Sequence, residues 1–121
     1  MASTGTIFQK EMYNAALNIG NVETDVRVDF KDFIPVGYFS LYVSTTGAGS
    51  VLKIQYILSF DGENFYIPRD NSGSPEDDIV TAHAPGIQIY GFKPPVAPYM
   101  KLKLTISTAN ASNVTVKLAI Q

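Results

Sequence analysis

The chain has 121 residues, 45% of them hydrophobic and only 17% charged, with a formal net charge of -2. This length suits a single domain with one core, and the charge balance lacks the clustered basic residues that grip a phosphate backbone, so we expect no nucleic-acid partner. The absence of cysteine excludes disulfide bridges, thiolate metal sites and a cysteine nucleophile. Because charged residues usually make up about 25% of a globular chain, we expect something else to cover part of the exterior.

Residues 1–14, MASTGTIFQKEMYN, have neither the basic start nor the apolar run of a signal peptide. No stretch approaches the ~18 apolar residues of a membrane span. We therefore expect no signal peptide and no membrane partner. The expected location is cytoplasmic, unless the protein leaves the cytosol by lysis or a non-classical route. Residues 1–14 are predicted to be an N-terminal arm or a first edge strand, with Ile7 and Phe8 as candidate partner-binding residues, and residues 15–121 to form one β-sandwich domain.

The first half of the chain predicts three strands. Residues 22–30, VETDVRVDF, alternate apolar and polar side chains, which is typical of a half-buried strand. Residues 36–44 and 51–60 are apolar on both faces, as strands in the middle of a sandwich or against another subunit would be. Tyr38 and Tyr42 in the first of these two segments are further candidate partner-binding residues.

The segment YILSFDGENFYIP, residues 56–68, contains the Asp-Gly dipeptide that favours a tight hairpin turn. We predict that one strand ends at Phe60 and that a return strand begins at Phe65. Gly62 would supply a positive φ, and short polar side chains would bond local backbone amides. The predicted structural residues of the turn are Asp61, Gly62, Asn64 and Phe65. A catalytic carboxylate pair formed by Asp61 and Glu63 is the functional alternative.

A polar loop over residues 69–78, RDNSGSPEDD, interrupts the strand series. Its oxygen-bearing side chains match no calcium-loop spacing, so we interpret it as a solvated loop and expect no metal ion or cofactor, leaving its order open. The candidate calcium ligands are Asp70, Asn71, Glu76, Asp77 and Asp78. His83 is the single histidine and has no nucleophile motif nearby, so we interpret it as a loop or interface residue and predict no catalytic residues.

The C-terminal third predicts three more strands. Residues 87–92, IQIYGF, form one that the following prolines end. Residues 100–107 and 113–120 alternate apolar and polar residues, and we predict that they pair as a hairpin. The lysines of these strands, at positions 101, 103 and 117, are interpreted as a solvated face. Seven to eight strands at this spacing predict an all-β chain, a single antiparallel β-sandwich of immunoglobulin-like or jelly-roll type.

Residues 41–68 and 91–121 together resemble the small β-sandwich structural proteins of tailed bacteriophages and prophages, including head decoration and other virion accessory proteins. The resembling pattern is a strand, a Gly-rich turn, a strand ending in Ser-x-Asp-Gly-x-x-Phe, an Ala-Pro-Tyr-led strand and a terminal hairpin. The resemblance implies a non-enzymatic protein of the virion that self-associates, with a homotrimer as the expected form, and binds a larger viral assembly.

Two alternatives stay open. The first is a carbohydrate-binding β-sandwich module, in which tyrosines would form a platform for a glycan. The tyrosines at strand positions are Tyr38, Tyr42, Tyr56 and Tyr66. The second is a small hydrolase or lyase, which would need His83 or the Asp61 and Glu63 pair in a concave pocket.

Overall fold

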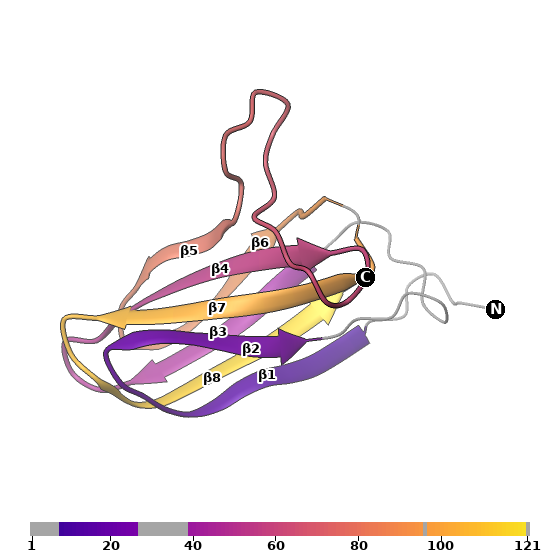
Figure 1. Cartoon of the computed structure of the whole chain (residues 1–121). Helices are drawn as coiled ribbons and strands as arrows, with labels where there is room; N and C mark the ends of the chain where they lie inside the picture. The colour runs from indigo at the N-terminus through magenta and orange to yellow at the C-terminus, as the bar shows by residue number, and fades with distance from the viewer. Residues whose placement is uncertain (1–7, 27–38, 96, 121) are drawn as a thin grey trace.

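The computed structural model describes residues 8–26, 39–95 and 97–120, and these residues form eight strands and no helix (Figure 1). The strands are β1 (Phe8–Leu17), β2 (Gly20–Val26), β3 (Phe39–Thr46), β4 (Val51–Ser59), β5 (Asp78–His83), β6 (Gly86–Phe92), β7 (Tyr99–Ser107) and β8 (Ala111–Ile120). The prediction of an all-β chain is confirmed. None of the described segments is a helix able to cross a membrane.

The strands form two four-stranded antiparallel sheets with the orders β1-β8-β3-β6 and β2-β7-β4-β5. Strand pairing is nested: β1 pairs with β8, β2 with β7, β3 with β6 and β4 with β5. This arrangement is an eight-stranded jelly roll. The predicted β-sandwich is therefore confirmed, and of the two predicted topologies the jelly roll is the one observed.

The core lies between the two sheets. It is filled from both sides by the alternating apolar residues of β7 and β8, because every second side chain of a strand points to the same face. Fully buried residues of these and the central strands include Leu41, Val43, Leu52, Ile54, Leu102, Leu104, Val114, Val116 and Leu118. As predicted, β3 and β4 are interior strands, and their outward positions are half-buried.

The predicted C-terminal hairpin is wrong. β7 and β8 follow one another in the chain, but β7 pairs with β2 and β4 while β8 pairs with β1 and β3. Residues 108–110 therefore carry the chain from one sheet to the other. Alternation shows which face of a strand is apolar, but it contains no information about which strand lies alongside.

The predicted return strand from Phe65 is also wrong. Leu58 and Tyr66 form an isolated bridge, with N···O distances of 3.0 and 2.8 Å. The chain then enters a long loop that projects from the sandwich before β5 begins at Asp78 (Figure 1). A tight two-residue turn does not form because seven residues separate the bridged pair.

The predicted boundary at residue 14 falls inside β1, since residues 8–14 begin this edge strand. Ile7, Tyr38 and the predicted strand residues 27–30 lie outside the described residues, and Phe8 is described only by its backbone.

Candidate functional site

The carboxylate of Asp61 organises the turn after β4. Its Oδ1 accepts hydrogen bonds from the backbone amides of Glu63 and Asn64, both at 2.8 Å, and from the Ser59 hydroxyl at 2.9 Å. Its Oδ2 accepts a bond from Nδ2 of Asn64 at 2.9 Å. These bonds, led by the two backbone amides, hold the pKa of Asp61 well below its ordinary value of 3.8. The geometry gives Asp61 a structural role, with Glu63 contributing its amide and not a paired carboxylate.

The other turn residues complete this arrangement. Gly62 has a φ of 80° and is buried, and its amide donates to the Ser59 hydroxyl at 2.9 Å. The Phe65 ring lies 4.5 Å from the Lys101 ammonium, which connects the turn to β7. The segment after β4 is consequently held in one conformation.

The interpretation of His83 as a loop or interface residue is wrong, because it ends β5 and its exposed fraction is 3%. Nε2 lies 3.1 Å from the Gly86 carbonyl oxygen, which can only accept, so Nε2 carries the hydrogen. Nδ1 lies 2.6 Å from the Tyr90 hydroxyl oxygen, and in the neutral ring it accepts a hydrogen bond from that hydroxyl. Burial raises the pKa of Tyr90. Both imidazole nitrogens are used in connecting β5 to β6.

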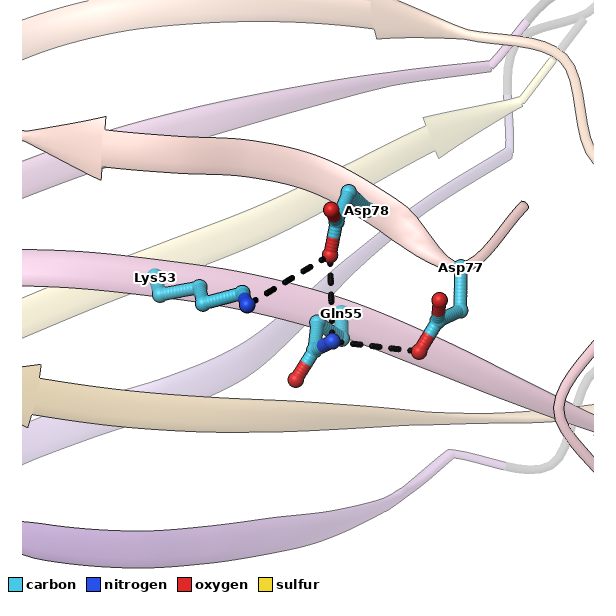
Figure 2. Close-up of polar contacts among 4 residues, drawn as sticks. All are labelled: Lys53, Gln55, Asp77 and Asp78. Carbon is cyan, nitrogen blue, oxygen red and sulfur yellow. Dashed lines mark hydrogen bonds and ion pairs between the residues drawn. The ribbon is translucent and has the colours of Figure 1, made fainter. Parts of the chain in front are cut away.

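The far end of the loop is fixed to β4 by the polar cluster that Figure 2 shows. Nε2 of Gln55 donates to Oδ2 of Asp77 at 3.1 Å and to Oδ1 of Asp78 at 3.0 Å. Lys53 Nζ lies 3.8 Å from the same Asp78 oxygen. The Tyr56 amide also donates to the Asp77 carbonyl at 3.0 Å, and burial, with Glu76 and Asp77 nearby, raises the pKa of Tyr56 to about 12.

The calcium alternative finds no support in this cluster. Across the described parts of the chain, no group of three or more His, Cys, Asp or Glu side chains could hold a metal ion. Every residue from 69 to 78 is described, and Asp78 is already part of β5. Asp70 Oδ1 accepts the Ser72 and Ser74 amides at 2.8 and 3.0 Å, which closes a turn at the loop tip.

A hollow of about 360 Å³ lies between the turn, the start of the loop, Pro95 and Ala97; we call it the loop pocket. Phe60 and Tyr66 line it with exposed fractions of 81% and 70%. The sequence placed both aromatics at strand positions, Phe60 at the end of one predicted strand and Tyr66 in the return strand. β4 ends at Ser59, however, and this places Phe60 outside the sandwich.

A second apolar feature occupies the outer face of the sheet β1-β8-β3-β6. Ile87 and Ile89 of the edge strand β6 are 68% and 67% exposed. Ile89 is paired with Tyr42, whose half-buried ring lies 5.3 Å from the Lys117 ammonium. Tyr42, Ile89 and Lys117 line a shallow hollow of about 240 Å³. Sequence reasoning named Tyr42 as a candidate but missed both isoleucines, since β6 was counted only as a strand.

Comparison with known proteins gives a likeness of fold. No protein-family model matches the chain, and no curated protein sequence matches it. A solved structure of infectious bursal disease virus, strain Gx, matches with a TM-score of 0.55 at 12% identity, over 95% of this chain and 31% of the viral chain. The VP2 protein of that virus, in derived T=1 particles, matches with a TM-score of 0.53 at 10% identity, over 95% of this chain and 31% of the other.

The likeness between this chain and the two viral proteins is one of fold. The chain spans about a third of the length of the viral chains. The CBM22-1 xylan-binding domain of Paenibacillus barcinonensis Xyn10C also matches, with a TM-score of 0.42 at 11% identity, over 99% of this chain and 88% of that domain. At this TM-score the likeness carries no argument about function.

Proposed function

We propose that the protein is a non-enzymatic structural protein of a virion that self-associates as a homotrimer and binds a larger assembly such as a phage capsid or tail. The observation that carries the proposal is the unprotected apolar edge strand β6. Jelly rolls are common in viral capsids. The fold shared with the bursal disease virus proteins therefore supports a structural role in a virion. The resemblance of residues 41–68 and 91–121 to phage structural proteins is the further support.

The four edge strands differ in how they avoid pairing with other chains. β1 contains Lys10 and Glu11 and has two irregularities in its pairing with β8, and β5 is irregular against β4. β2 carries the exposed Glu23. β6, with the sequence GIQIYGF, has no charged residue, no proline and an unbroken register with β3. Charges, prolines and bulges are the usual protection of an edge, so β6 is the edge best suited to contact another chain.

The position of the isoleucines adds apolar contact area to this edge. Ile87 and Ile89 pair with the outward residues Ser44 and Tyr42, so their side chains stand on the outer face and cannot reach the core. A contact between this face and a different surface of the next copy is heterologous, and such contacts close into a ring when the rotation allows. A homotrimer is the ring that we propose.

The test compares two variants with opposite expectations. Ile87→Lys combined with Ile89→Lys places charges on the β6 face, and we expect it to sediment as a 13.2 kDa monomer with cooperative unfolding retained. Ile19→Lys is the control, because Ile19 is 63% exposed in the connection between β1 and β2. We expect the control to stay assembled like the wild type.

An assembled double variant would contradict the role of β6. Measurable hydrolysis of ester or glycoside substrates by the purified protein would contradict the non-enzymatic part of the proposal.

A further inference from the structure

We infer that the loop pocket binds a neutral oligosaccharide. Its volume of about 360 Å³ lies within the range of about 300–1,000 Å³ that small-molecule sites occupy. It shares no lining residue with the β6 face. The inference therefore does not depend on self-association and can fail or succeed separately.

The aromatic residues of the pocket are exposed and held in place. Tyr66 is fixed by its two backbone hydrogen bonds with Leu58, and Phe60 directly follows the last residue of β4. Both rings keep most of their surface in solvent although they line a concave site. The C–H face of a sugar ring packs against such an aromatic face while its hydroxyl groups remain free at the edge. Because the backbone is already ordered, little conformational entropy is lost on binding.

Polar side chains lie beside these rings with unused hydrogen-bonding capacity. Asn64 is oriented by the bond from its Nδ2 to Asp61, which leaves its carbonyl oxygen as an acceptor. Arg69 donates from Nη1 to the Gly73 carbonyl at 2.9 Å, and its other donors have no partner among the described residues. Planar amide and guanidinium groups suit the adjacent hydroxyls of a sugar, since each presents more than one bonding position in a fixed plane.

A second, polar hollow of about 550 Å³ adjoins the loop pocket, and the two share Arg69 and Pro95. Asp70, Ser72 and Glu76 contribute to its lining. A ligand with more than one ring can place one ring on Phe60 and Tyr66 and the next over these polar groups. Carboxylates outnumber the single guanidinium across the two hollows, which disfavours an acidic sugar or a phosphate.

The experiment titrates the full chain with cellohexaose, maltohexaose, mannohexaose and xylohexaose by calorimetry, and with hexagalacturonate as the acidic probe. We expect saturable binding of at least one neutral hexaose and no binding of hexagalacturonate. Tyr66→Ala and Phe60→Ala should each weaken the binding by about tenfold or more, and Tyr66→Phe should retain it, because stacking needs the ring and not the hydroxyl. Arg69→Gln should weaken it through lost hydrogen bonds.

Ile19→Ala is the matched control, since it removes an exposed apolar side chain elsewhere and should bind as the wild type does. Thermal unfolding of each variant confirms that it is folded. Absence of saturable binding to all four neutral hexaoses would overturn the inference, as would binding of hexagalacturonate alone. Neutral-sugar binding that survives both alanine substitutions would overturn the assignment to the loop pocket.

Discussion

At the scale of single residues, two buried threonines differ in whether their hydroxyls are hydrogen-bonded. Thr24 Oγ1 donates to the Leu102 carbonyl at 3.4 Å, whereas Thr45 Oγ1 has no partner among the described residues. A buried polar group without a partner costs about 1–3 kcal/mol, and valine has nearly the shape of threonine. We expect Thr45→Val to raise the free energy of unfolding by about 1 kcal/mol and Thr24→Val to lower it by about 0.5–1 kcal/mol. Urea denaturation of both variants measures this, and a less stable Thr45→Val protein would contradict it.

Asp61 makes the stability of the protein depend on pH. Its folded pKa is lower than its ordinary value of 3.8, so the folded chain binds fewer protons than the unfolded chain in the acid range. The contribution of Asp61 is therefore complete above pH 3.8 and is lost as the pH falls toward the lower, folded pKa. Asp61→Asn removes this contribution, and we expect its urea midpoint to fall less steeply than that of the wild type between about pH 5 and pH 2.

The control for this pH dependence is Glu63→Gln, which removes a carboxylate from the same turn and leaves the bonds to Asp61 intact. Glu63→Gln should keep the pH-dependent stabilisation by Asp61 that Asp61→Asn loses. Parallel pH profiles for the wild type and Asp61→Asn would show that the turn bonds do not favour the ionised carboxylate.

Residue-scale features were predictable where their chemistry is local. Asp61, Gly62 and Asn64 bond within a few positions of one another, so their types and spacing already indicate a turn. His83 could not be placed in this way. Its burial depends on the turn that brings Tyr90 back beside it, and sequence alternation gives no sign of that contact.

At the scale of elements, the side chain of Gln55 fixes the end of the loop between β4 and β5 to β4. Its amide donates to two carboxylates, one of them on the buried Asp77, while the ion pair of Lys53 with Asp78 is half exposed. Hydrogen bonds to charged groups contribute more than exposed ion pairs. We expect Gln55→Ala to lower the free energy of unfolding by about 1–2 kcal/mol and Lys53→Ala by less than about 0.5 kcal/mol.

Amide hydrogen exchange of residues 69–77 provides a second measurement of this difference, and it should become faster in Gln55→Ala than in Lys53→Ala. An equal loss of stability in the two variants would contradict the larger contribution of Gln55.

Elements were predictable as strands but not as pairs. The alternation over residues 100–107 and 113–120 correctly indicated β7 and β8, yet each pairs with strands that are far away in the sequence. The outward direction of Ile87 and Ile89 is also set by pairing, because it follows from their register with β3. Neither feature is encoded within the strand itself.

At the scale of the whole molecule, strand number and spacing were sufficient to predict a β-sandwich, and the nested pairing then selected the jelly roll. The two proposed binding surfaces depend on that topology. One lies on a sheet face whose edge strand is uncharged, and the other lies where β4 ends and a long loop begins. The proposed roles of both surfaces concern contacts with other molecules and leave the core unchanged.

Self-association is the central claim, and the mass of the wild-type protein in solution tests it most directly. Light scattering over a concentration series should give three times the chain mass of 13.2 kDa, constant down to low concentration. A mass of 13.2 kDa at every concentration would contradict the claim.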